Sequence, residues 1–366
     1  MRKLQTFENG TKSKAGKLSV IDLHGTWREM GRQYGALMSD ELRGLSDRVR
    51  MCFLPDDTSR QKAAEAAEKF IANFPFRLKE VIAGMSETSG LGIEELKLLN
   101  AAEIISLPYY PSVQGSAIAV WGDYAEGSLI LGRNYDSCEW LKDFDDYIVL
   151  SCFHPADGAL SVAAIGYAGE ICAVNAMNEK GLFLELNNGM PSGGSLRYEN
   201  RIPAVAELFT FLLDSETLDE LESCFQTVKT DFAYVIGAAD GQTARAFEWP
   251  VFDVKRRTTR SRPGLTVLTN HFTEFSWGLP RPEDKDSWQS RTRRRNLLNL
   301  AKHFKGTINE KVMMDIMDTK IEDLGATTSS TLYQLVVVPE RYELWFKIPD
   351  AQDWTLIDMK ALLEPR

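Results

Sequence analysis

The spacing of apolar residues changes along the chain. In the first hundred residues it is helical, with candidate helices over residues 26–53, 60–74 and 76–105. Thr26 stands where an N-cap is expected, and Pro75 marks the end of the second stretch because proline cannot continue a helix. Before these helices, a polar leader runs into a short strand closed by Gly25. The N-terminal segment is therefore predicted to be mostly helical.

From Ser116 onward, short apolar runs separated by turn signals such as Asp157-Gly158 replace the helical pattern. Candidate strands cover residues 116–121, 128–132, 147–153, 160–166, 171–177, 182–186, 232–239, 244–249, 265–270 and the closing hairpin 331–348. Helical spacing returns over residues 203–213, 216–228, 288–304 and 309–317. Closely spaced strands form hairpins, so the pattern predicts largely antiparallel sheets with helices stacked outside them, a four-layer α+β sandwich.

Composition narrows the choice of partners. The 366 residues carry a formal net charge of −10, which argues against nucleic acid as a main partner. Two basic runs, 255–262 and 291–295, fit a solvated strand edge and a helix face. Five scattered cysteines without a CxxC pair fit reduced thiols in a cytosol. No signal-peptide pattern and no apolar run of membrane-spanning length is present, so we expect a cytoplasmic protein without a membrane partner.

Motifs for metal chemistry or a serine triad are missing from the sequence. There is no HExxH, no GxSxG and no spaced Cys/His set, so we expect neither a metal nor another cofactor. The chain has only four histidines, so few residues could supply the histidine of a Ser-His-Asp triad. One of them, His271 in "LTNHF", lies at a strand end where it can face a pocket, although an ordinary loop histidine fits the pattern equally well.

The segment "GRNYD" is a stronger candidate for chemistry. Asn134 and Asp136 lie on one face if the strand continues through them. In isolation the cluster fits a surface turn. However, the preceding strand and tight turn bring Arg133 and Asp136 back beside Gly115-Ser116. An arginine and an aspartate beside the first residue of a strand can hold a nucleophile and tune a nearby amine.

The segment "GSAIAVWGDYAEGSLILGRNYD" resembles the start of the mature catalytic chain in N-terminal-nucleophile (Ntn) amide hydrolases and acyltransferases. The group it is most similar to contains acyl-coenzyme A:6-aminopenicillanic-acid acyltransferase, with acid ceramidase-like amidases and choloylglycine hydrolases as relatives. Further likenesses follow in the right order: "GTWREMGRQYGALMSDEL" with "LKEVIAGMSETSGLGIEELKLLNAAE", then "YAGEICAVNAMNEKGLFLELN", "LTNHF" with "SRTRRRNLL", and the closing hairpin. One such match would be weak, but five in order cover most of the chain.

This resemblance implies an αββα Ntn-hydrolase sandwich, with residues 1–114 as a helical pro-segment and 115–366 as the catalytic core. In such proteins a precursor cuts itself before a cysteine. The freed α-amine, with a pKa of about 7.7–8.0, then serves as general base for the thiol.

The resemblance also implies roles for individual side chains. Arg133 and Asp136 match the pair that supports the nucleophile, and Asn270 matches the amide that stabilises the oxyanion. Arg291 matches a second arginine of the group, with Arg293 left open as the alternative. The remaining matches are pocket-lining positions, occupied here by Tyr167 and Asn187.

The chain departs from the family pattern at the nucleophile itself. The family's "C-(S/T)-(S/A)" start aligns the cysteine with Gly115 and the hydroxyl residue with Ser116. In one reading Gly115 replaces the cysteine, naturally or by substitution, and leaves an unprocessed, nucleophile-less form. In a second, Ser116 is the nucleophile, released by cleavage of the Gly115-Ser116 bond. In a third, the fold is kept only for ligand binding. The apolar alternation and Trp121-Gly122 fit only the first register.

The predicted function follows from the first reading. It is amide hydrolysis or N-acyl transfer on a small N-acylated molecule, which is the expected partner. The acceptor (water or an amine), an acyl-coenzyme A as a further partner, and assembly into a homo-oligomer all stay open.

Overall fold

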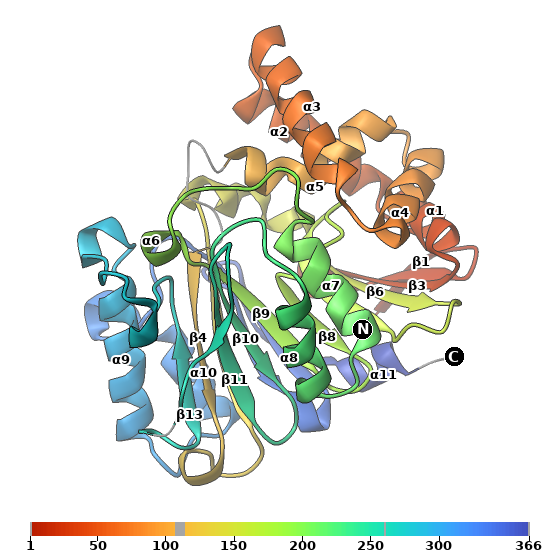
Figure 1. The fold of residues 1–366 in the computed structure, drawn as a ribbon. Helices are drawn as coiled ribbons and strands as arrows, with labels where there is room; N and C mark the ends of the chain where they lie inside the picture. The colour runs from red at the N-terminus through yellow and green to blue at the C-terminus, as the bar shows by residue number, and fades with distance from the viewer. Residues whose placement is uncertain (1, 107–113, 260, 365–366) are drawn as a thin grey trace.

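A computed structural model describes residues 2–106, 114–259 and 261–364, which form two β-sheets between layers of helices (Figure 1). The ten-stranded sheet has the order β1-β2-β3-β6-β7-β8-β9-β10-β11-β12. Only its β3–β6 contact, among the strand pairs of the described residues, is parallel. Its strands are β1 (Arg2–Phe7), β2 (Gly10–Ala15), β3 (Leu18–Gly25), β6 (Ile148–Pro155), β7 (Val162–Tyr167), β8 (Asn175–Asn178), β9 (Phe183–Asn188), β10 (Tyr234–Ala239), β11 (Ala244–Trp249) and β12 (Lys255–Arg256).

The six-stranded sheet has the order β13-β4-β5-β14-β15-β16 and is antiparallel throughout. Its neighbouring strands β4 and β5 are the two that the sequence singled out. The strands are β4 (Gln114–Val120), β5 (Ile130–Asp136), β13 (Leu265–Leu268), β14 (Thr331–Val338), β15 (Glu343–Ile348) and β16 (Gln352–Asp358).

Helices cover the outer face of each sheet. The outer face of the six-stranded sheet packs on α9 (Ser290–His303) and α10 (Glu310–Asp318), through a core that includes Ile118 and Leu297. The ten-stranded sheet is covered by α7 (Ala204–Asp214) and α8 (Leu218–Thr227), where Phe225 stacks on Phe247 of β11 at 4.7 Å. The predicted αββα sandwich is confirmed.

The helices of the N-terminal segment lie beyond one end of the sandwich (Figure 1). They are α1 (Trp27–Leu37), α2 (Ser39–Phe53), α3 (Asp57–Ala72), α4 (Phe76–Thr88) and α5 (Ile93–Ser106). Thr26 caps α1 as expected, through a capping box with Glu29. Among the described residues, no helix is long and apolar enough to cross a membrane.

The first 25 residues differ from the polar leader and single strand expected from the sequence. They form three consecutive strands, β1 to β3, at one edge of the ten-stranded sheet. The sequence hides β1 and β2 because an edge hairpin needs only backbone pairing and few buried apolar positions. Of the β2 side chains, those of Lys12 and Ala15 are buried. The N-terminal segment is therefore part of the sheet as well as a group of helices. The short helix α11 (Met359–Leu363) and β16 were also not predicted.

Candidate active site

Gly115 lies at the start of β4, beside the end of β5. Gly115 pairs with Tyr135, and Ser116 pairs with Asn134, so the turn between the strands brings the "GRNYD" segment to this position. Residues 107–113, which precede β4, lie outside the described residues. The expected juxtaposition of Gly115 with Arg133 and Asp136 is thus present.

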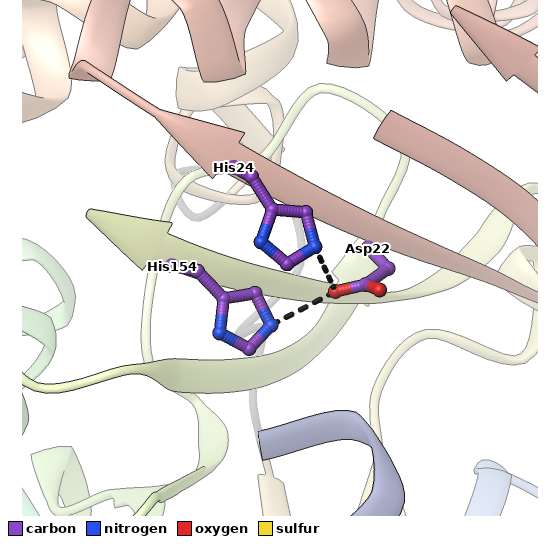
Figure 2. Close-up of side chains that lie close together, drawn as sticks. All are labelled: Asp22, His24 and His154. Carbon is purple, nitrogen blue, oxygen red and sulfur yellow. Dashed lines mark ion pairs between the residues drawn. The ribbon is translucent and has the colours of Figure 1, made fainter. Parts of the chain in front are cut away.

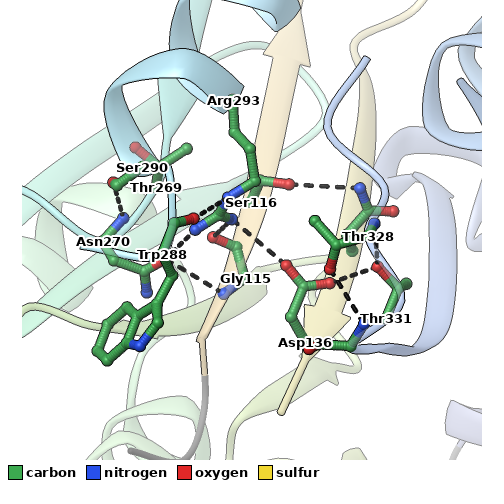
Figure 3. Close-up of polar contacts among 12 residues, drawn as sticks. Gly115, Ser116, Asp136, Thr269, Asn270, Trp288, Ser290, Arg293, Thr328 and Thr331 are labelled. Carbon is green, nitrogen blue, oxygen red and sulfur yellow. Dashed lines mark hydrogen bonds and ion pairs between the residues drawn. The ribbon is translucent and has the colours of Figure 1, made fainter. Parts of the chain in front are cut away.

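Polar side chains bind both backbone groups of Gly115 (Figure 3). Its N–H donates to Asn270 Oδ1 at 3.4 Å, and its carbonyl oxygen accepts from Arg293 Nη1 at 2.7 Å. Arg293 Nη2 also donates to Asn270 Oδ1 at 2.6 Å, so the three residues form a closed ring of contacts. Asn270 follows β13, and Arg293 lies in the first turn of α9, which fixes both against the end of β4.

The space where a side chain would begin at Gly115 is already filled. A Cβ built there would lie 2.6 Å from Asn187 Oδ1 and 2.8 Å from the carbonyl oxygen of Asn134, and would also meet Arg133 Nη1. The backbone of Gly115 has φ +154°, a value that L-residues with a side chain rarely adopt. The local packing therefore fits glycine.

Arg133 is the centre of a buried polar network between the two sheets. Its Nη1 lies 3.0 Å from Glu185 Oε2 and also donates to Asn187 Oδ1, while Asn187 Nδ2 donates to Glu185 Oε2 at 2.7 Å. Its other donors bind Asn175 Oδ1 at 3.1 Å and the Leu186 carbonyl at 2.7 Å. The side chains of Arg133 and Glu185 are completely buried. Burial raises the pKa of Glu185, against the opposing effects of Arg133 and Asn187.

Asp136 holds Arg293 from the other side. Asp136 Oδ2 lies 3.3 Å from Arg293 Nη1, and Asp136 Oδ1 accepts from Thr331 Oγ1 at 2.6 Å. Burial raises the pKa of Asp136 and outweighs the charge of Arg293 and the Thr331 hydrogen bond. Asp136 is therefore a positioning residue for Arg293 and, through it, for Gly115.

Asn270 and His271 are fixed by the first residue of α9. Ser290 Oγ accepts from the Asn270 N–H at 2.8 Å and lies 2.7 Å from His271 Nδ1. The Asn270 side-chain amide donates to the Asn188 carbonyl at 2.9 Å. Burial, with the positive charges of nearby arginines, lowers the pKa of His271 to about 3. His271 is neutral at physiological pH and lies beside the residue that contacts Gly115.

The Ser116 side chain lies on the face of β4 that points away from the ten-stranded sheet. Its Oγ accepts from Asn134 Nδ2 at 3.3 Å, and Asn134 Oδ1 accepts from Gln334 Nε2 at 2.9 Å. Gln334 in turn donates to the Met317 carbonyl of α10 at 2.6 Å. The Ser116 hydroxyl thus faces the outer helices, whereas Arg133 faces the ten-stranded sheet.

Two of the residues named from the resemblance lie apart from Gly115. Arg291 is exposed at the surface, and Arg293 is the arginine of α9 that reaches Gly115. Tyr167 is buried at the end of β7, two strands away from β9. A hollow of about 540 Å³ between α10 and β16 shares no residue with the Gly115 network.

Sequence reasoning missed several residues of the network. Glu185, Asn175, Thr331 and Ser290 were not singled out, although each contacts a residue that was. Glu185 could have been found from the sequence. Glu185 and Asn187 are two positions apart in the otherwise apolar run "LFLELN", which places two polar groups on one face of a buried strand.

Comparisons with known proteins give structural likenesses only. No family model and no curated protein matches the chain. The chain is similar to a Caenorhabditis elegans ortholog of N-acylethanolamine-hydrolyzing acid amidase (TM-score 0.46, 18% identity, 64% of this chain and 94% of that one). It is also similar to a mutant of the conjugated bile acid hydrolase of Clostridium perfringens (TM-score 0.45, 14% identity, 69% of this chain and 95% of that one). A third similar structure is penicillin V acylase of Agrobacterium tumefaciens (TM-score 0.46, 13% identity, 67% of this chain and 86% of that one). Likenesses of this size assign neither a family nor an activity to the chain.

The packing around Gly115 leads to a stability prediction. Gly115→Ala is expected to lower the free energy of unfolding by about 1–3 kcal/mol, because the new methyl group meets Arg133, Asn187 and a backbone carbonyl. The measurement is denaturant unfolding at neutral pH. Gly127→Ala is the matched control, since a Cβ there meets nothing within 4 Å. Equal effects of the two substitutions would contradict the packing argument.

Proposed function

We propose that the chain is an amide hydrolase or N-acyltransferase of the Ntn type in a form without its nucleophile, with Gly115 at the nucleophile position. One observation carries this proposal: the polar side chains of Asn270, Arg293 and Arg133 converge on a residue that has no side chain of its own. A buried polar network of this kind is costly for stability alone, and such networks are often kept for chemistry.

With a cysteine at position 115, each neighbour has a task. The thiol sulfur attacks the carbonyl carbon of the amide, and the free α-amine takes the thiol proton. The Asn270 amide group can donate to the developing oxyanion once it leaves the Asn188 carbonyl. Arg293 holds the residue by its carbonyl, and Asp136 fixes Arg293. The leaving amine then takes the proton, and water or a second amine releases the acyl group.

The substrate class follows from this chemistry: a small molecule with an N-acyl bond. Glycine offers no nucleophilic atom, so the chain as written binds such a molecule and does not cleave it. The five cysteines are scattered along the sequence without a CxxC pair, which supports a reducing compartment such as the cytosol.

Replacing Gly115 with cysteine, which supplies the missing thiol sulfur, tests the proposal. Gly115→Cys is expected to cut itself before residue 115, giving fragments of residues 1–114 and 115–366 on a denaturing gel, and to hydrolyse simple N-acyl amides. The new side chain requires the Arg133 guanidinium, Asn187 Oδ1 and the backbone carbonyl of Asn134 to shift, so Gly115→Cys is expected to be less stable than the wild type, as Gly115→Ala is. Gly115→Ala adds the same Cβ without a thiol, so it is the matched control and should stay intact.

A folded Gly115→Cys protein that stays intact and inert would contradict the proposal. Circular dichroism and a cooperative unfolding transition establish that the variant is folded. That outcome would favour a ligand-binding protein that only shares the architecture.

A second candidate, cleavage at Gly115-Ser116, has one observation in its favour. Arg293 donates to the Gly115 carbonyl, the group that a Ser116 hydroxyl would attack in self-cleavage. The Ser116 hydroxyl itself faces Asn134, on the other face of the strand. Intact-mass measurement of the wild-type protein after long incubation decides between the two. A fragment starting at Ser116, lost in Ser116→Ala, would establish this candidate, and a single full-length mass would exclude it.

A further inference from the structure

One aspartate and two histidine side chains converge at the carboxyl ends of β3 and β6 (Figure 2). Asp22 and His24 lie on β3, and His154 lies directly opposite His24 on β6. The Nε2 atoms of His24 and His154 lie 3.1 and 2.8 Å from Asp22 Oδ1. The imidazole rings are stacked at 4.3 Å with an angle of 5° between their planes. Both histidines therefore present the same nitrogen to one carboxylate oxygen.

We propose that Asp22, His24 and His154 form a binding site for a divalent transition-metal ion of the zinc class. Two imidazole nitrogens and one carboxylate oxygen are the ligand types of such ions, whereas calcium and magnesium need sites rich in oxygen. Ligand bonds of about 2.0–2.2 Å in a tetrahedral arrangement place ligand atoms roughly 3.3–3.5 Å apart. The three atoms here lie within 4.8 Å of one another, so small side-chain rotations admit the ion.

The surroundings support this assignment. His154 Nδ1 lies 3.0 Å from Ser161 Oγ, the kind of outer contact that fixes the ring of a metal-bound histidine. The His24 side chain is 18% exposed, which gives an ion a route of entry and leaves room for water as a fourth ligand.

A fourth side chain lies on the same face but is already engaged. Cys152 is opposite Asp22, and its Sγ lies 3.3 Å from His154 Nε2. Its thiol donates to the Leu362 carbonyl of α11 at 3.1 Å. We therefore assign three protein ligands and an open position, the pattern of a site that keeps water or a small ligand on the metal.

This site is separate from Gly115 and independent of the proposed function. The nearest strand of the Gly115 network is β8, which carries Asn175, and it lies two strands from β6, a distance of roughly 10 Å at about 4.8 Å per strand. An ion held here would join β3 to β6, the contact by which the N-terminal strands attach to the rest of the sheet. Its three residues are hard to connect from the sequence, because His154 is far from Asp22-x-His24 along the chain.

Cobalt(II) is a direct probe of the site. The full-length chain without a purification tag is stripped with a chelator, and Co²⁺ is added. We expect one equivalent to bind with the visible absorption of a four-coordinate cobalt ion, Zn²⁺ to displace it, and Zn²⁺ to raise the midpoint of thermal unfolding. His24→Gln is expected to weaken binding by at least about 10- to 100-fold. Cys152→Ser is the matched control on the same face and should leave binding unchanged.

Two results would overturn the proposal. The first is a wild-type protein with neither cobalt absorption nor a Zn²⁺-dependent midpoint, which would mean that the two histidines only hydrogen-bond to Asp22. The second is equal Co²⁺ affinity in the wild type and in His24→Gln. If His24→Gln does not fold, Ser161→Ala replaces it, with an expected loss of about 10-fold in affinity.

Discussion

Arg133→Met is expected to lower the free energy of unfolding by about 3–5 kcal/mol, because it leaves the Glu185 carboxylate buried without its cationic partner. Methionine has a similar length and no charge, so the loss comes mainly from the broken ion pair. The measurement is denaturant unfolding at neutral pH. Since burial already raises the pKa of Glu185, the carboxyl group of the variant should take up a proton more readily, and the loss should shrink as the pH falls.

Two further variants make this prediction specific. Adding Glu185→Gln to Arg133→Met removes the unpaired negative charge of the Glu185 carboxylate and should recover part of the lost stability. Arg28→Met breaks a surface pair with Glu87, where the arginine side chain is 42% exposed, and should cost less than about 1 kcal/mol. An Arg133→Met protein as stable as Arg28→Met, or a double variant no better than the single one, would show that the buried pair does not stabilise the fold.

The second large effect is a loss of stability in acid that depends on His271. Its pKa is about 3 in the folded protein against 6.5 for an ordinary histidine, so the unfolded chain binds a proton that the folded chain excludes. Stability from this group is complete above pH 6.5 and is lost as the pH falls toward 3, by about 1.4 kcal/mol per pH unit. Between pH 7 and pH 5 the wild type should therefore lose about 2 kcal/mol more than His271→Gln.

Chemical denaturation across this pH range measures the difference. His303→Gln is the matched control, because His303 is exposed at the end of α9 and makes none of the His271 contacts. Parallel stability curves for the wild type and His271→Gln would contradict the prediction.

The sequence was sufficient for the elements that bury a regular apolar face. The helices α1 to α5 correspond to the predicted helical stretches, although the stretch 26–53 divides at Met38 into α1 and α2. The hairpin of β4 and β5 and the helix pair α9 and α10 follow from apolar spacing and turn residues. The β1–β2 hairpin could not be found in this way, because its strands are paired through the backbone at a sheet edge and bury few side chains. The αββα layers follow once the strand runs and helix runs are seen to alternate.

The candidate site was only partly predictable. Arg133, Asp136 and Asn270 could be named because they belong to recognisable segments, although Arg133 lies within β5 rather than after it. Contacts such as Arg293 with Gly115 and Arg133 with Glu185 join residues far apart in the chain, and only the packing of the two sheets determines them. The choice between Arg291 and Arg293 depends on the rotation of α9 about its axis, which spacing alone leaves open.

The parallel contact between β3 and β6 determines what a cut before residue 115 would do. The N-terminal fragment would keep β1 to β3 within the same sheet as β6, so the two fragments would stay together as a tightly associated heterodimer. Gel filtration would then give the same elution volume before and after processing. The cut protein would also lose its concentration-independent stability, because dilution would favour release of a fragment that carries β1 to β3 and α1 to α5.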